Sequence, residues 1–280
     1  MSKLVGRRVR KLDDPALLAG TARFVDDIRL PRMLHAAILR TEGLARDFGS
    51  LRAVDRVNFV LQAGELRSII GPNGAGKSTF FKLISGELRP SGGRIFFKGR
   101  DITGLPQHVI SRLGVTKSYQ ITTIFPKLTV FENVRVAAQS RRTTFNFWQR
   151  AGALPGVAER VREILGAVEL THKANELAAN LGHGLQRHLE IGIALACEPE
   201  LLLLDEPTAG MSPEETEHTM ALIRQVARGR TVVVVEHKMK LVMNISDRIT
   251  VLHQGQVLAE GTPAEIRANL RVQQVYLGAR

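Results

Sequence analysis

The stretch GPNGAGKST, residues 71–79, decides the fold class of this 280-residue chain. It fits the pattern G-x-x-x-x-G-K-[ST]. The apolar stretch ELRSII before it predicts a short buried strand, and STFFKLIS after it predicts an amphipathic helix that ends near Gly86. A strand, a glycine-rich loop and a helix in this order are typical of phosphate binding.

The glycines of this loop expose backbone N–H groups, which can face an anion together with the helix N-terminus. Lys77 is expected to reach the β- and γ-phosphates of a nucleotide, and the Ser78 hydroxyl is expected to ligate Mg²⁺. A plain glycine turn is the alternative. The predicted phosphate-binding residues are Gly71, Pro72, Asn73, Gly74, Ala75, Gly76, Lys77, Ser78 and Thr79.

Two acids end the stretch LLLLDEP, residues 201–207. Four successive leucines suit a strand buried on both faces of a parallel sheet, and ligands bind at the carboxyl ends of such strands. We expect Asp205 to hold Mg²⁺ through water and Glu206 to polarise or position the attacking water. The alternative is a solvated turn without a role.

The stretch between these acids and the next strand predicts a well-capped helix. Ser212 is the expected N-cap, Pro213 takes the first helical position, Glu215 completes a capping box, and Gly229 ends the helix. The following TVVVVEH predicts another buried strand with His237 at its tip. A γ-phosphate contact is the hypothesis for this histidine, and a structural role is the alternative.

Composition limits the classes of partner. The chain has 39 Lys and Arg against 27 Asp and Glu, a formal net charge of +12. Its basic residues are spread along the sequence, and no basic run interleaved with aromatics predicts base stacking, so no nucleic-acid partner is expected.

No run approaches the ~18 apolar residues of a membrane span, and no signal peptide follows the basic start, so a cytosolic chain is expected. The single cysteine, Cys197, lies in an apolar stretch and is expected to be buried.

The ordered motifs resemble the nucleotide-binding subunit of an ATP-binding cassette (ABC) transporter over residues 38–280. This resemblance implies an α/β P-loop NTPase with a mixed sheet core, an antiparallel β subdomain and a helical subdomain at about residues 121–183. It implies ATP and Mg²⁺ as ligands, Phe48 stacking on adenine, and Gln120 sensing both Mg²⁺ and the transmembrane partner. AGMS, residues 209–212, matches the loop that crosses between two subunits.

The stretch LGHGLQRHLE, residues 181–190, occupies the place where this family has a sequence like LSGGQ at a helix N-terminus. The resemblance implies that Gly182, His183 and Gly184 close over the ATP held by a second subunit. Gly182 stands where the family has serine, and Leu185 where it usually has glutamine, so weaker ATP-driven closure is expected. A metal site at His183 and His188 is the alternative, but their spacing misses i, i+4.

Several stretches resemble the importer subunits for branched-chain amino acids, among them FGSLRAVDRVNF, PKLTVFENV, LAEGTPAEIRAN and VYLGAR. The expected partners are transmembrane permease subunits, a second ATP-binding subunit and, indirectly, a solute-binding protein, with the chain on the cytoplasmic face of the membrane. Two alternatives stay open. One is a urea or short-amide importer, and the other is a degenerate subunit with weak hydrolysis.

Two segments fall outside these motifs. Residues 1–38 resemble the start of the molybdopterin-binding subunit of the xanthine dehydrogenase family, whose cofactor needs a far longer chain. They are expected to be an extension without activity, which leaves residues 39–280 as the ATP-binding domain. The basic, aromatic stretch 141–152 suggests either a loop against the permease or membrane, or a capped helix turn.

Overall fold

The computed structural model describes residues 37–118, 124–140 and 156–277. The resemblance of the N-terminal extension, the role of Gln120 and the alternatives for residues 141–152 therefore lie outside the described residues. Contacts along the chain separate residues 1–35 from residues 36–280.

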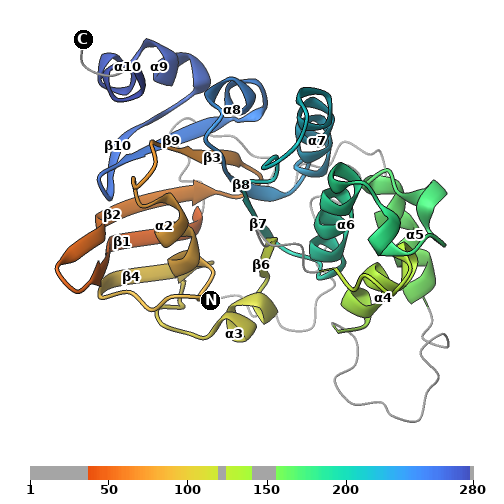
Figure 1. Cartoon of the computed structure of the whole chain (residues 1–280). Coiled ribbons are helices and arrows are strands. Elements are labelled where there is room, and N and C mark those ends of the chain that lie inside the picture. The colour runs from red at the N-terminus through yellow and green to blue at the C-terminus, as the bar shows by residue number, and fades with distance from the viewer. Residues whose placement is uncertain (1–36, 119–123, 141–155, 278–280) are drawn as a thin grey trace, which may run out of the picture. The chain divides into compact units, whose positions relative to one another are not determined.

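A six-stranded sheet, in the order β10-β9-β3-β8-β7-β6, forms the centre of the described chain (Figure 1). Its strands pair in parallel except β10, which is antiparallel to β9. The sheet is therefore mixed, as expected. The strands are β3 Leu66–Ile70, β6 Val115–Ser118, β7 Leu201–Asp205, β8 Thr231–Val235, β9 Arg248–His253 and β10 Gln256–Gly261.

The central strands are buried on both faces, because neighbouring residues of one strand enter different cores. Leu202 and Leu204 of β7 join one apolar cluster, while Leu201 and Leu203 join another. The valines of β8 alternate in the same way. The continuous apolar runs in the sequence are thus the expected signature of a parallel sheet covered on both sides.

A second, antiparallel sheet has the order β2-β1-β4-β5. The first strand begins at Ala37, which pairs with Gln62, so the fold starts two residues before the expected domain boundary at residue 39. Residues 37 and 38 of the expected extension therefore belong to the fold. The strands are β1 Ala37–Phe48, β2 Leu51–Gln62, β4 Gly92–Phe97 and β5 Arg100–Asp101.

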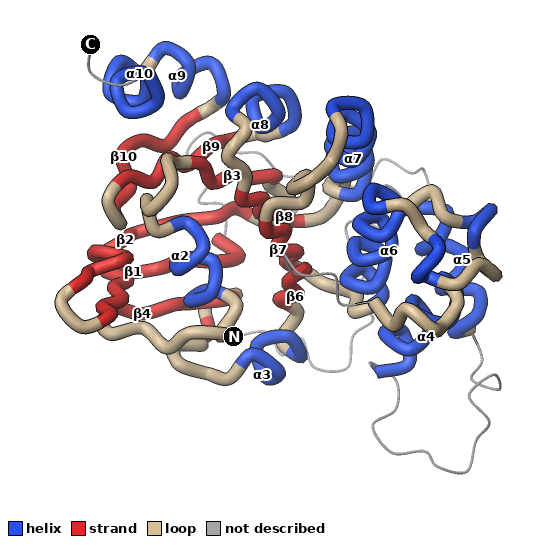
Figure 2. Tube along the Cα trace, in the orientation of Figure 1, coloured by secondary structure: helices blue, strands red, loops and turns tan. Residues whose placement is uncertain are grey.

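Some helices cover the sheets, and others form a group of their own. Figure 2 shows all described helices in blue. Helices α4, α5 and α6 pack on one another, and the apolar face of α5, from Val157 to Leu165, is buried in their common core. The helices are α2 Lys77–Ile84, α3 Gln107–Arg112, α4 Val130–Ser140, α5 Val157–Ala167, α6 His183–Ala196, α7 Pro213–Val226, α8 Met239–Ile245, α9 Pro263–Ala268 and α10 Leu270–Leu277. Short 3-10 turns lie at Thr171–Lys173 and Ala178–Asn180.

Helix α7 confirms the capping prediction. The Ser212 hydroxyl accepts from the Glu215 backbone N–H, the Glu215 carboxylate accepts from the Ser212 N–H, and Pro213 is the first helical residue. Gly229 lies beyond the C-cap in a turn with φ 72°.

The prediction for Cys197 was wrong: its side chain is only half-buried at the C-cap of α6, where the helix reaches the protein surface.

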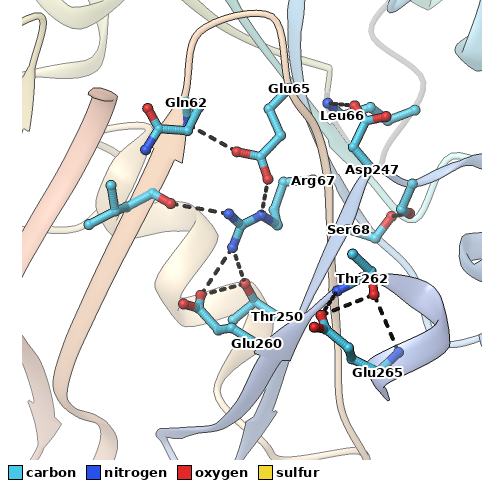
Figure 3. Close-up of polar contacts among 12 residues, drawn as sticks. Gln62, Glu65, Leu66, Arg67, Ser68, Asp247, Thr250, Glu260, Thr262 and Glu265 are labelled. Carbon is cyan, nitrogen blue, oxygen red and sulfur yellow. Dashed lines mark hydrogen bonds and ion pairs between the residues drawn. The ribbon is translucent and has the colours of Figure 1, made fainter. Parts of the chain in front are cut away.

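A buried arginine joins strands of both sheets (Figure 3). Arg67 of β3 is 3 % exposed and pairs with Glu65 and Glu260. It also donates to the Thr250 hydroxyl and to the carbonyl of Val60 in β2, at 3.0 and 3.2 Å. No local sequence pattern pointed to this network.

Candidate nucleotide-binding site

Three neighbouring parallel strands bring the predicted motifs to one edge of the central sheet. Strand β8 lies between β3 and β7, and all three run in the same direction. The phosphate loop follows β3, Glu206 follows β7, and His237 stands two residues beyond β8. The predicted common edge is therefore present, at the position where parallel sheets hold ligands.

The phosphate loop borders a hollow of about 340 Å³. Helix α2 begins at Lys77, and Ser78 of its first turn is exposed beside the hollow. Glu206 lies on the same hollow. The lining residues are Phe48, Leu51, Ala53, Asn73, Gly74, Ala75, Gly76, Lys77, Ser78, Thr79 and Glu206.

Two glycines of the loop are needed for packing as well as for ligand approach. A Cβ atom on Gly71 would lie 2.2 Å from the carbonyl oxygen of Leu252, and one on Gly76 would lie 2.3 Å from that of Ala53. Gly76 also has φ 96°, a backbone conformation that favours glycine. The loop is thus held against β9 and β2, a constraint that the motif alone does not reveal.

Lys77 folds over its own loop. Its ammonium group donates to the carbonyl oxygens of Gly71 and Pro72 at 2.8 and 3.0 Å. Burial lowers the pKa of Lys77, and the nearby carboxylates of Glu206 and Asp205 oppose that shift. The cation therefore lies between the phosphate loop and the acid pair, where an anionic ligand would replace weak backbone acceptors with a charged one.

Asp205 ends β7 with its side chain buried. Its carboxylate lies 3.4 Å from the ammonium group of Lys117, which also pairs with Glu87 at 2.8 Å. Lys117 carries no signal in the sequence beyond being a lysine inside the short strand β6, so it was not predicted. The Asp205 carboxylate and the open Ser78 hydroxyl offer the hard oxygen ligands that Mg²⁺ prefers.

The turn after β7 is strained and held by a distant arginine. Glu206 has φ 45°, an uncommon conformation for a residue with a side chain. Arg187 of α6, itself buried, donates to the carbonyl oxygens of Asp205 and Glu206 at 2.9 and 3.0 Å, and to that of Pro207 at 3.3 Å. No local pattern singles out Arg187 for this role, because these carbonyl groups lie about twenty residues further along the chain.

The end of the hollow at Phe48 is open and apolar. Phe48 is 44 % exposed, and Leu51 beside it is 65 % exposed. The guanidinium of Arg46 lies 4.7 Å from the centre of the Phe48 ring. Arg46 and Leu51 are further candidates for contact with a nucleotide base that the sequence analysis missed.

The stretch at residues 181–185 lies at a helix N-terminus, as predicted. Gly182 is the N-cap of α6, with an extended backbone, and it has no side chain to bond the helix. The His183 ring nitrogen Nε2 lies 3.1 Å from the carbonyl oxygen of Ala209, in the loop that the resemblance assigns to subunit crossing. The structure places Gly182, His183 and Gly184 outside the hollow lined by the phosphate loop.

The two histidines of this stretch do not meet. His188 is buried, and its ring packs edge-to-face on His218 at 5.2 Å. Burial and the neighbouring His218 lower the pKa of His188. In the described part of the chain, no three histidine, cysteine or acidic residues gather in a way that suits a metal ion.

The comparisons with known proteins agree with this geometry. A family model described as ABC transporter matches residues 54–209, and one described as branched-chain amino acid ATP-binding cassette transporter matches residues 256–280. The chain is 43 % identical over 250 residues to the high-affinity branched-chain amino acid transport ATP-binding protein BraF of Pseudomonas aeruginosa, covering 86 % of this chain and 98 % of that protein. It is 41 % identical over 251 residues to the corresponding LivG protein of Escherichia coli, with the same coverage.

Solved structures give the same result for the fold. The ADP conformation of an ATP-binding cassette of an ABC transporter matches with a TM-score of 0.77 and 29 % identity, over 87 % of this chain and 99 % of that one. A nucleotide-free cassette matches with a TM-score of 0.76 and 28 % identity, over 87 % and 100 %. No helix among the described residues is both long and apolar enough to cross a membrane. The chain belongs to the ATP-binding subunits of the ABC transporter family.

Proposed function

We propose that this chain is the ATP-hydrolysing subunit of an importer for branched-chain or related amino acids. The observation that carries the proposal is the hollow shared by the phosphate loop, Phe48 and Glu206, at the common edge of three parallel strands. The names of the relatives BraF and LivG supply the class of solute.

In this proposal the nucleotide lies with its base against Phe48 and its phosphates on residues 71–79. Lys77 exchanges its backbone carbonyl partners for the phosphates, and the N-terminus of α2 faces the same anion. Ser78 and Asp205, together with Gln120, would hold Mg²⁺, which neutralises phosphate charge when bound.

Glu206 is the proposed general base. Its strained turn directs it to the hollow, within reach of a water that attacks the terminal phosphate. His237, exposed at the same sheet edge, is the proposed contact for the γ-phosphate. Such positioned groups act mainly by orienting the reactants and stabilising charge, because phosphoryl transfer needs little covalent chemistry from the protein.

A second ATP-binding subunit completes each site in this proposal. Gly182, His183 and Gly184 do not line the hollow of their own chain, and Gly182 and His183 are exposed at the N-terminus of α6, where they would close over the ATP of a partner. Transmembrane permease subunits and, indirectly, a solute-binding protein are the other proposed partners, with the chain on the cytoplasmic face of the membrane. The ATP-binding domain, expected at residues 39–280, is assigned from Ala37 onward because β1 begins there. No nucleic-acid partner and no role for residues 1–36 is proposed.

Uptake assays in the native host test the class of solute. Deleting the gene is expected to abolish uptake of labelled leucine, isoleucine and valine, and the wild-type chain should restore it. The Glu206→Gln variant serves as the matched control that should not restore it. Unchanged leucine uptake with lost urea uptake would contradict the amino-acid proposal and leave the motor role intact.

A further inference from the structure

Glu236 is a fully buried acid with no role in the site described so far. It stands between the end of β8 and His237 and has 0 % exposure. Its backbone N–H donates to the carbonyl of Ile69, two residues before the phosphate loop, at 3.3 Å. The residue therefore lies where three functional segments meet: the phosphate loop, the turn after Glu206 and the histidine at the strand tip.

The Glu236 carboxylate accepts hydrogen bonds from both neighbouring segments. Its Oε1 atom accepts from the Thr208 hydroxyl at 2.6 Å and from the Thr208 backbone N–H at 3.1 Å. Its Oε2 atom accepts from the backbone N–H of His237 at 3.2 Å. Thr208 is also 0 % exposed, so these bonds are shielded from water.

These hydrogen bonds connect the turn that carries Glu206 to the strand end that carries His237. Glu206 precedes Thr208 by two residues, and its own N–H donates to the carbonyl of Val235 at 2.9 Å. On the other side, the Nδ1 atom of the exposed His237 ring lies 3.8 Å from Oε2 of Glu236. A buried carboxylate without donors would be costly, so the three bonds fix both its position and the positions of its donors.

We propose that Glu236 is a positioning residue for ATP hydrolysis: it ties the turn that carries Glu206 to the strand tip that carries His237. The inference rests on the proposed function, because it assumes that Glu206 and His237 act on bound ATP. Glu236 itself touches neither the hollow nor the nucleotide. Its loss should therefore reduce kcat while leaving ATP binding to the phosphate loop nearly unchanged.

Glu236→Gln is the sharpest single change, because it keeps shape and volume. A glutamine side chain has only one acceptor atom, and its amide nitrogen is a donor. If the oxygen stays with Thr208, the amide group faces the N–H of His237. If the amide is reversed, it faces the N–H of Thr208. In either orientation, Glu236→Gln therefore loses the hydrogen bond from the backbone N–H of either Thr208 or His237.

The Thr208 hydroxyl provides a second, independent test. Thr208→Val removes the bond to Glu236 at nearly constant shape, and Thr208→Ser restores the hydroxyl. Thr219 of α7 is also 0 % exposed and is not among the residues that line the hollow, so Thr219→Val gives the matched control. This control loses an equally buried hydroxyl, which contacts His188 and Met211 and not Glu236.

The experiment measures kcat and KM for Mg²⁺-ATP with the full-length chain and these variants. Glu236→Gln should lower kcat roughly ten- to a hundred-fold, the effect of one hydrogen bond to a charged group. KM should stay within about twofold, because the proposed ATP-binding residues, Phe48 and residues 71–79, do not include Glu236 or Thr208. Thr208→Val should lower kcat in the same direction, Thr208→Ser should recover most of it, and Thr219→Val should keep the wild-type value.

A double variant separates positioning from general damage. In a His237→Ala background, Glu236→Gln should cost much less in kcat than it does alone, because part of its effect passes through that histidine. Hydrogen exchange of the backbone amides at Thr208 and His237 should quicken in Glu236→Gln, a readout that needs no turnover. An unchanged kcat in an active wild-type background would overturn the proposal, as would equal losses with and without His237. A wild-type chain that binds but never hydrolyses ATP would instead contradict the proposed function itself.

Discussion

Phe48 offers a direct test of the adenine end of the hollow. Its ring is 44 % exposed and already carries the Arg46 guanidinium on it. Phe48→Ala should raise the dissociation constant for ATP about two- to tenfold, the range expected for one aromatic stacking contact. Phe48→Tyr, which keeps the ring, should bind ATP as the wild type does. Equal affinity in all three proteins, measured by calorimetry, would place the base elsewhere.

Gly182 tests whether the unusual helix start weakens closure. A Cβ atom at this position would meet no heavy atom within 4 Å, so a serine fits without strain. Gly182→Ser adds both an N-cap and a donor for phosphate. In a Glu206→Gln background it should tighten ATP-driven dimerisation about tenfold, measured by sedimentation. Gly182→Ala, which has the Cβ but no hydroxyl, is the control, and equal tightening by both variants would contradict the role of the donor.

Individual site residues divided into those with a local signal and those without one. The phosphate loop, Asp205 and Glu206 were predicted because their chemistry is encoded in a few adjacent residues. Arg187, Lys117 and Glu236 were not singled out, since their partners come from other strands and helices. Their contacts arise from burial beside another segment, which a local pattern does not encode.

The N-terminus of α7 gives a prediction at the level of one element. The Ser212 backbone N–H, followed by its hydroxyl, lowers the pKa of the Glu215 carboxyl. A lowered pKa means that the charged form stabilises the folded state, so this stabilisation is present near neutral pH and is lost as the pH falls below about 4. The Tm difference between wild type and Glu215→Gln should therefore shrink in acid. A difference that stays constant down to pH ~3 would contradict this assignment.

Elements with strong periodicity or clear caps were predictable, and their boundaries were less so. The apolar runs of β7 and β8 and the capping box of α7 were found where expected. The ATP-binding domain begins earlier than the predicted residue 39, because Ala37 pairs with Gln62, a partner that no local signal reveals. Pairing between strands, and not the β-propensity of the local sequence, therefore sets where the first strand begins.

The Arg67 network gives a prediction for the whole molecule, because it joins β3 to strands of both sheets (Figure 3). Arg67→Met leaves the buried Glu65 carboxylate without its cation, a change that typically costs about 3–5 kcal/mol. The Tm should fall by roughly 6–15 °C for a chain of this size. Adding Glu65→Gln should recover part of the loss, since the unpaired charge is then gone. A Tm unchanged by Arg67→Met would show that the network contributes little.

The arrangement of the two sheets lay beyond the sequence patterns. The family resemblance implied a mixed sheet and an antiparallel one, and the structure confirms both. The family resemblance did not reveal that glycines of the phosphate loop pack against carbonyl groups of β9 and β2. These close approaches join Gly71 to Leu252 and Gly76 to Ala53, residues that lie outside the motif itself, so only the folded chain shows them.

Hydrolysis of Mg²⁺-ATP by the purified full-length chain, beside its Glu206→Gln variant, tests the central claim most directly. We expect the wild type to release phosphate and the variant to lose at least about a hundredfold in kcat, the usual contribution of a general base. ATP affinity should be the same in both proteins, because Glu206 is not needed to hold the phosphates. A variant that hydrolyses ATP as fast as the wild type would contradict the role of Glu206 and the proposed site with it.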